Sequence, residues 1–375
     1  MAESNWDTKI VIGNREVYSY SDAQKKRHKR LSTRLRDAFG INQVSRYIVV
    51  KSLIEQLNNN SSEFKVIRGD ITHFFDEVDA KQTMKLVRNK VILTRGEELN
   101  LKNIIFDVNI AGLPQGNPVS SVLSEIALKD FDRFVYASIA PAFYARYVDD
   151  FVLLFYNDVQ NKIEVSKMEK AIAEELEPLG LRLSSEKFKI FNFSDNQEFD
   201  FLGYHLKKSN GEVKVTIAVK KLEKIKQKIK KTFAIFDASP KNTSDVFRLK
   251  LQIVNLLYGV ITFDVYGNKQ RSGLWFDYSL INDFSQISNL QRFLFREIRR
   301  RKLSLRTRNE IFPVVKGLKS MTQGDSKNAV INYTEMSDMK LIGLIKNLDP
   351  NYVRPVLFDK KKIVQRLFSK IYGEK

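Results

Sequence analysis

The sequence contains no cysteine and only three histidines. The lack of thiols excludes disulfide bonds, thiolate catalysis, zinc sites with cysteine ligands and iron–sulfur clusters. Because His28, His73 and His205 are the only imidazoles, a histidine-rich metal site is not expected either. Any metal ion bound by this chain should therefore be a hard cation with oxygen ligands.

Long apolar segments are also missing. No window of about eighteen residues is both apolar and uncharged, as a membrane-spanning helix requires. The segment MAESNWDTKI lacks the order of basic and then apolar residues that marks a secretory signal. We therefore expect a cytoplasmic protein with no membrane partner.

Acidic residues are in the minority, with 44 Asp and Glu against 63 Lys and Arg, and the formal net charge is +19. This excess predicts a polyanionic partner, because each phosphate that a protein neutralises releases condensed counterions. A membrane surface would also attract such a chain, but the aromatic content of 11% favours a folded nucleic-acid channel. At 375 residues, of which 43% are hydrophobic, the chain is long enough for two or three lobes.

The first part of the chain has the pattern of a mixed fold. Residues 15–60 have helical spacing, residues 64–79 indicate a strand followed by a turn and a helix, and residues 119–131 place their apolar side chains on one helix face. The segments FYARYV and FVLLFY predict a β-hairpin. Strands and helices should therefore alternate around one small sheet.

Beyond residue 218 the pattern becomes almost wholly helical and more basic. The runs VKKLEKIKQKIKK and RFLFREIRRRKLSLRTR lie in this region. One such run is usually a solvated helix face, but several in one region favour contacts with a phosphate backbone. The segment FDKKKIVQRLFSKIY predicts an amphipathic helix that either docks on the body of the protein or contacts nucleic acid.

Two adjacent carboxylates, Asp149 and Asp150, lie between the predicted hairpin strands, where uncompensated charge is costly. A third, Asp70, ends another predicted strand. If these strands are neighbours, three carboxylates meet at one edge of a sheet and repel one another unless a divalent cation is present. Two Mg²⁺ ions about 4 Å apart would satisfy the cluster, activate a 3′-hydroxyl and stabilise a pyrophosphate leaving group. The sequence therefore predicts nucleotide polymerase chemistry.

Five motifs resemble those of the reverse transcriptase family and follow its order. They are DITHFFD, GLPQGNPVSSVLSEIAL, YVDD, LGLRLSSEKFK and FLGYHL. The resemblance implies an α+β right-hand polymerase whose small antiparallel sheet packs on helices. It places the fingers at residues 1–66 with part of 80–110, the palm at 67–218, and a helical, basic, thumb-like region at 219–375.

The resemblance also implies roles for the acidic motifs. Asp70 and Asp149 would bind two Mg²⁺ ions, or Mn²⁺ as an alternative, with Asp150 beside them and the carbonyl of Ile71 completing the metal shell. For Asp150, a turn residue that caps backbone amides is the alternative. Lys187 would protonate the leaving pyrophosphate, although the residue alone would be read as a surface lysine.

Other motif residues would bind the nucleotide and the primer. Phe75 corresponds to the ring that excludes a 2′-hydroxyl, although Phe75 could also be ordinary core and the neighbouring Phe74 competes for either role. Gln115 and Gly116 would meet the incoming nucleotide from the turn before a helix, and a purely structural turn is the alternative. Leu202 and Gly203 resemble the hairpin that grips the primer terminus.

The fingers of this family provide cations for the triphosphate, and the sequence does not distinguish among the candidates. These are Lys25, Lys26, Arg30 and Arg46.

The variant motif GLPQGNPVSSVLSEIAL is most similar to bacterial stand-alone reverse transcriptases of the defence-associated, abortive-infection type. The similarity implies that the protein synthesises a DNA product from dNTPs with an RNA template or a non-coding RNA. A partner protein or a homo-oligomer is also compatible with this resemblance. Template-independent and protein-primed synthesis remain alternatives. An RNA-binding maturase or chaperone on the same scaffold is disfavoured because all three aspartates are retained, and RNA synthesis is disfavoured by Phe75.

Overall fold

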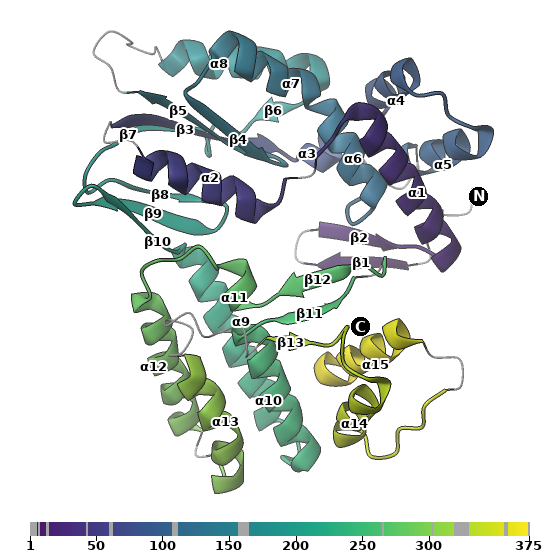
Figure 1. The fold of residues 1–375 in the computed structure, drawn as a ribbon, viewed down its shortest axis with the longest axis vertical. Coiled ribbons are helices and arrows are strands. Elements are labelled where there is room, and N and C mark those ends of the chain that lie inside the picture. Colours follow the sequence, from purple (N-terminus) through teal and green to yellow (C-terminus); the bar gives the residue numbers. More distant parts are fainter. Residues whose placement is uncertain are drawn as a thin grey trace. The chain divides into compact units, whose positions relative to one another are not determined.

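The computed structural model describes most of the chain as two compact units (Figure 1). The described residues are 6, 8–12, 15–42, 44–59, 63–106, 112–156, 165–264, 266–301, 303–318, 330–355 and 359–373. The first unit comprises residues 1–197 and 208–213, and the second comprises 198–207 and 214–375. The limits of fingers, palm and thumb given above stay predictions.

The first unit begins with a β-hairpin. Strands β1 (Thr8–Ile12) and β2 (Arg15–Ser19) pair in antiparallel register, so the expectation of helix from residue 15 onward is wrong for β2. Helix α1 (Asp22–Phe39) begins only after Ser21, which forms a capping box with Gln24. It ends at Gly40, whose φ of +63° suits glycine. Helix α2 (Arg46–Asn59) follows.

A five-stranded sheet contains the predicted hairpin. Its order is β4 (Phe143–Tyr147), β5 (Asp150–Tyr156), β3 (Phe64–Thr72) and β6 (Arg182–Leu183), and β7 (Lys189–Phe193) also pairs with β3. All of these pairings are antiparallel. Strand β3 therefore has hydrogen-bonded neighbours along both of its edges.

Helices complete the core of the first unit. They are α3 (Phe74–Glu77), α4 (Ala80–Lys90), α5 (Arg95–Ile105), α6 (Pro118–Ala127), α7 (Lys129–Phe134), the π-helix η1 (Val135–Ile139), α8 (Val165–Leu176) and the 3₁₀-helix η2 (Glu177–Leu179). Helix α6 packs against α1 and α4. Its buried face includes Val119, Val122, Leu123 and Ile126, which confirms the helical face predicted for this segment. These residues join Ile67 and Phe151 of the sheet in one apolar cluster.

The second unit combines helices with short strands. Its elements are β8 (Glu198–Phe201), β9 (Tyr204–Ser209), β10 (Glu212–Ile217), α9 (Val219–Asp237), α10 (Thr243–Leu257), β11 (Val260–Phe263), β12 (Lys269–Ser272), α11 (Leu274–Asp277), α12 (Ser285–Arg300), α13 (Leu305–Gly317), β13 (Ile331–Asn332), α14 (Asp338–Leu348) and α15 (Lys360–Tyr372). The end of β9 and the start of β10, within residues 208–213, belong to the first unit. Strands β12, β11 and β13 form a small sheet that the almost wholly helical prediction missed.

Helix α15 docks on the second unit. Its apolar side chains Ile363, Val364, Leu367 and Ile371 are buried in a cluster with residues of α10 and α14. Of the two alternatives for this segment, docking on the body of the protein or contact with nucleic acid, the structure confirms docking for the apolar face. Helices and small sheets make up both units, and the described sheets are antiparallel except for the β11–β13 pair, which is parallel. This arrangement confirms the α+β class. None of the helices that the structure describes is both long enough and apolar enough to cross a bilayer.

Candidate active site

Strands β3 and β5 bring the predicted carboxylates together. In their antiparallel register Asp70 lies opposite Asp150, and cross-strand partners have Cβ atoms about 4.5–5.5 Å apart. Asp149 lies in the two-residue turn between β4 and β5, and its carbonyl accepts a hydrogen bond of 3.1 Å from the N–H of Ile71. The three aspartates therefore lie at one end of the β3–β5 pair.

Two cationic side chains partly neutralise this cluster. Asp70 is only 4% exposed, and its Oδ2 accepts a hydrogen bond of 2.7 Å from Nζ of Lys187. Nη2 of Arg68 lies 3.5 Å from Oδ1 of Asp150. The sequence analysis did not name Arg68, yet Arg68 precedes Asp70 by two positions on one strand, so a period of two already places both side chains on one face.

Burial and mutual repulsion oppose ionisation of two of the carboxyl groups. Burial is the largest cause of the raised pKa of Asp149, which reaches about 6; a backbone hydrogen bond lowers it, and the charges of Asp150 and Asp70 raise it. Burial also raises the pKa of Asp150, although Arg68 opposes the shift. Since the charged forms are disfavoured, an added cation would be stabilised at this site.

The chemistry of this donor set fits a hard divalent cation. Carboxylate and backbone carbonyl oxygens are the ligands that Mg²⁺ prefers. In the described part of the chain, however, no three His, Cys, Asp or Glu side chains are grouped closely enough to hold a metal ion. Lys187 engages Asp70 instead, so a cation shared by Asp70 and Asp149 would compete with its ammonium group. The two Mg²⁺ ions, and the role of Ile71 as a ligand, stay predictions.

A turn attached directly to β3 positions Lys187. The carbonyl of Asp70 accepts a hydrogen bond of 2.8 Å from the N–H of Ser184, and the N–H of Lys187 donates to the carbonyl of Ser184 at 3.1 Å. The side chain of Lys187 is 57% exposed, so its ammonium group is accessible from solvent while it contacts Asp70.

The loop before α6 lies against the residue predicted to contact the sugar. The N–H of Leu113 donates to the carbonyl of Phe75 at 2.7 Å. A Cβ on Gly112, whose φ is +63°, would lie 2.1 Å from the same carbonyl oxygen, so this close approach requires glycine. Phe74 is 2% exposed and belongs to the core, whereas Phe75 is half-buried. Of the two rings, only Phe75 has substantial accessible surface.

Gln115 and Gly116 occupy the turn that leads into α6, as predicted from their place before a helix. Gly116 has a φ of +85°. The next residue, Asn117, caps the helix by accepting a hydrogen bond of 2.9 Å from the N–H of Val119. Asn117 Nδ2 also lies 3.2 Å from Nδ1 of the buried His28, which fixes this turn to α1.

Comparison with known families identifies the class of protein to which these motifs belong. A family model described as "Reverse transcriptase (RNA-dependent DNA polymerase)" matches residues 15–206. The chain belongs to the reverse transcriptase family. The matched segment of this reverse transcriptase runs from β2 to β9 and contains all of the predicted site residues.

A curated relative of this reverse transcriptase is Protein YkfC of Escherichia coli (strain K12). The two sequences are 30% identical over 197 residues, which cover 41% of this chain and 50% of YkfC. The chain thus matches about half the length of this relative.

Solved structures with a distant likeness include two telomerases. One is telomerase from Candida albicans in complex with a TWJ fragment of telomeric RNA, with 14% identity, a TM-score of 0.41, and coverage of 93% of this chain and 58% of that chain. The other is apo telomerase from Candida tropicalis, with 13% identity, a TM-score of 0.42, and coverage of 93% and 61%. Scores of this size say nothing about activity.

The predicted primer-grip residues of the reverse transcriptase lie in the second unit. Leu202 and Gly203 form the turn between β8 and β9, with φ angles of +47° and +86°. The carbonyl of Gly203 accepts a hydrogen bond of 3.0 Å from the N–H of Ala218. This tight turn is consistent with a backbone role, and the primer grip stays a prediction.

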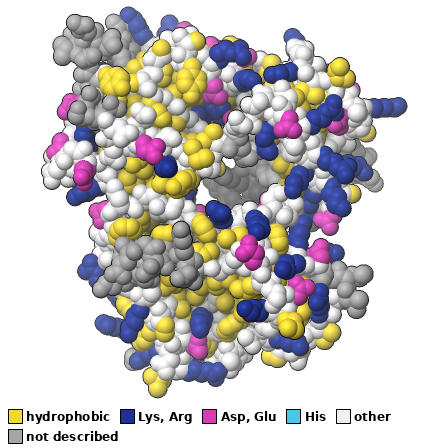
Figure 2. Space-filling view, in the orientation of Figure 1, with side chains coloured by type: hydrophobic (Ala, Val, Ile, Leu, Met, Phe, Trp, Pro, Cys, Tyr) yellow, Lys and Arg dark blue, Asp and Glu magenta, His cyan; other side chains and the backbone are white. Residues whose placement is uncertain are grey.

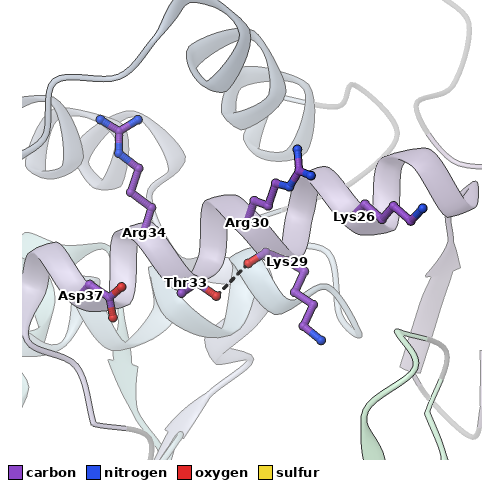
Figure 3. Close-up of a pocket in the computed structure, with 6 residues that line it drawn as sticks. All are labelled: Lys26, Lys29, Arg30, Thr33, Arg34 and Asp37. Atoms are coloured by element: carbon purple, nitrogen blue, oxygen red, sulfur yellow. Dashed lines mark hydrogen bonds between the residues drawn. The ribbon is translucent and has the colours of Figure 1, made fainter.

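Helix α1 carries several basic side chains beside a pocket (Figure 3). A cavity of about 550 Å³ is lined by Lys26, Lys29, Arg30, Thr33, Arg34 and Asp37. Two of the four predicted candidates, Lys26 and Arg30, line this cavity. Of the other two, Lys25 pairs with Asp22 at 3.6 Å, and Arg46 is the first residue of α2.

The sequence analysis missed two further cations of this cavity, Lys29 and Arg34. The four-residue spacing of positions 26, 30 and 34 could have indicated that Arg34 shares a helix face with Lys26 and Arg30. Figure 3 shows Arg30 and Arg34 on the same side of α1.

Proposed function

We propose that this chain is an RNA-directed DNA polymerase that adds deoxynucleotides at the aspartate cluster. The observation that carries the proposal is the pairing of Asp70 with Asp150, beside Asp149 and with Lys187 on Asp70, within a matched reverse transcriptase segment. Acidic groups with raised pKa values beside an exposed lysine suit phosphoryl transfer, which depends on charge compensation and positioning.

The divalent ions that this family generally uses would be bound by Asp70, Asp149 and the carbonyl of Ile71. We expect these ions to be Mg²⁺, with Mn²⁺ as the alternative. When bound, such ions polarise phosphate oxygens and lower the pKa of an attacking hydroxyl. Asp150 supplies further negative charge beside them. Lys187 holds a proton at Nζ next to Asp70 and would donate it to the departing pyrophosphate. Gln115 and Gly116 would contact the nucleotide from the turn before α6.

Phe75→Ala is expected to relax sugar selectivity, because removal of the half-buried ring leaves room for a 2′-hydroxyl. Discrimination against ribonucleotides should fall by roughly 10²-fold, measured as the ratio of kcat/KM for dNTP and rNTP. Phe74→Ala is the matched control, since Phe74 lies in the core; it should cost about 3–5 kcal/mol of stability without a specific change in that ratio. Unchanged selectivity in Phe75→Ala would remove Phe75 as the sugar gate.

We further propose an RNA partner for the basic second unit. Figure 2 shows lysine and arginine side chains scattered over the face in view, among hydrophobic and uncharged surface. On α12, a cavity of about 680 Å³ is lined by Arg292, Phe295, Arg296, Arg299 and Arg300. All four arginines are exposed and follow one helix face, while Phe293, Leu294 and Ile298 are buried beneath them. Exposed guanidinium groups beside an aromatic ring suit phosphates and unstacked bases.

Replacement of Arg292, Arg296 and Arg299 by glutamine should therefore weaken RNA binding. The slope of log K against log salt should become shallower by about 2–3, because each lost phosphate contact removes 0.7–0.9. Filter binding at several salt concentrations measures this slope. The control is the charge-matched triple variant of α9, Lys220→Gln with Lys224→Gln and Lys228→Gln. If only the α9 variant changed the slope, α12 would not be the RNA contact.

We place this activity in bacterial antiphage defence in the cytoplasm, with a non-coding RNA as template or primer. The motif GLPQGNPVSSVLSEIAL supports the defence assignment, and the arginine face of α12 supports the RNA partner. The test is to sequence the nucleic acids that copurify with the protein and those made after addition of dNTPs and Mg²⁺. Products complementary to a copurified RNA are expected. Products without any template sequence would favour template-independent synthesis, and bound RNA without synthesis would favour an RNA chaperone.

A further inference from the structure

The turn that carries Asp149 has an unusual backbone. Val148, the first of its two residues, has a φ of +63°, which a β-branched residue rarely adopts because its side chain then crowds the backbone. Glycine is usual at such positions in two-residue hairpins. A valine in this conformation persists only where the surrounding structure holds it.

Arg146 makes the contact that holds this turn. Its Nη1 donates a hydrogen bond of 2.8 Å to the carbonyl of Val148. Three further donors of the same guanidinium are held by acids: Nε and Nη2 bond the two oxygens of Asp132 at 2.8 and 2.6 Å, and Nη2 also bonds Glu125 at 2.7 Å. The side chain is only 6% exposed, so these bonds are shielded from water.

The acids that hold Arg146 are themselves fixed by two helices. Glu125 belongs to α6, which begins at the turn of Gln115 and Gly116, and Asp132 belongs to α7. The hydroxyl of Tyr144 donates to Asp132 at 2.6 Å. Burial alone would lower the pKa of Arg146, but the hydrogen bonds and charges of Asp132 and Glu125 outweigh it and raise the pKa. The planar guanidinium of Arg146 donates to Val148, Asp132 and Glu125 at the same time. The single ammonium group of a lysine cannot reproduce this geometry.

We propose that Arg146 is a positioning residue that fixes the Val148 carbonyl and thereby sets Asp149 and Asp150 opposite Asp70. It also ties this turn to α6 through Glu125. The inference rests on the proposed function for its kinetic consequence, but its structural claim concerns the turn alone. Arg146 acts through the aspartates and touches no substrate.

Arg146→Lys tests the proposal, with Arg133→Lys on α7 as control, because Arg133 is exposed and pairs only with Asp130 among the described residues. In Arg146→Lys the maximal rate of dNTP incorporation should fall by about 10²-fold while KM for dNTP changes by less than about threefold, since the nucleotide contacts remain. Mn²⁺ alone, titrated calorimetrically, should bind about tenfold more weakly. Arg133→Lys should match the wild type in both measurements.

A second substitution separates positioning from mere stability. Val148→Gly in the Arg146→Lys background should restore part of the lost rate and Mn²⁺ affinity, because glycine adopts positive φ without strain. If Arg146→Lys does not fold, the neutral triple variant Arg146→Gln, Glu125→Gln, Asp132→Asn replaces it, with the same losses expected. A lower melting temperature with unchanged rate and Mn²⁺ affinity in folded protein would overturn the proposal.

Failure of the proposed function would be recognised separately. If the wild type incorporates no dNTP, hydrogen exchange at the amides of residues 147–150 and Mn²⁺ binding still test Arg146. Faster exchange and weaker Mn²⁺ binding in Arg146→Lys would support the positioning role without any polymerase activity. Unchanged exchange and binding would refute it.

Discussion

Asp149→Asn combined with Asp150→Asn is expected to abolish deoxynucleotide addition, with a loss of roughly 10³–10⁴-fold. Both side chains lie at the end of the β3–β5 pair beside Asp70, and asparagine keeps their shape while removing the charge that would hold a divalent cation. Primer extension with saturating dNTPs and Mg²⁺ measures the loss. RNA binding should remain, because the arginines of α12 are untouched.

The melting temperature of this double variant is not expected to fall at pH 7. Burial raises the pKa of both carboxyl groups, so their ionisation opposes folding and its removal relieves the repulsion. Asp76→Asn is the matched control, since Asp76 is an exposed carboxylate on α3 and should retain full activity. Normal incorporation by the double variant would show that synthesis, if present, occurs elsewhere.

Gly69→Ala is expected to disrupt both stability and activity. Gly69 pairs with Phe151 across the β3–β5 ladder, and an added Cβ would lie 2.1 Å from Cζ of that fully buried ring. Overpacking of this kind costs about 1–3 kcal/mol or more. The strands that would have to move carry Asp70 and Asp150, so the rate of incorporation should also fall by about 10²-fold.

Chemical unfolding and primer extension of the same preparation measure the two effects of Gly69→Ala. Adding Phe151→Leu should recover part of the stability, because the smaller side chain leaves room for the new methyl group. Gly343→Ala is the control: it lies within α14, nothing surrounds its Cβ position within 4 Å, and it should gain about 0.5–1 kcal/mol. Additive effects of Gly69→Ala and Phe151→Leu would contradict the predicted clash.

Local patterns predicted much of the catalytic region. The strand before Asp70, the hairpin around Asp149 and the helix after Gly116 each follow from apolar periodicity and turn residues within a few positions. Gly180 ends η2 with a φ of +72°, a conformation that glycine adopts without strain. Sequence periodicity does not determine which strands are neighbours. The sequence therefore predicted that Asp70 and Asp150 meet only if their two strands are adjacent in the sheet.

The features that the sequence analysis missed depend on contacts between distant segments. Strand β13 pairs with β11 from about seventy residues away, and its two residues carry no periodic signal of their own. The bond from Arg146 to Val148 depends on the backbone conformation of the turn, and the acids that fix Arg146 come from two other elements. Arg68 is the exception, because its spacing from Asp70 was visible in the sequence.

The position of Asp70 on β3 affects how the protein should lose activity on heating. Strand β3 is hydrogen-bonded to β5 on one edge and to β6 and β7 on the other, so its amides should be among the last to exchange with solvent. Fraying at the periphery therefore leaves Asp70 in place. Thermal inactivation should accordingly coincide with cooperative melting of the whole sheet rather than precede it.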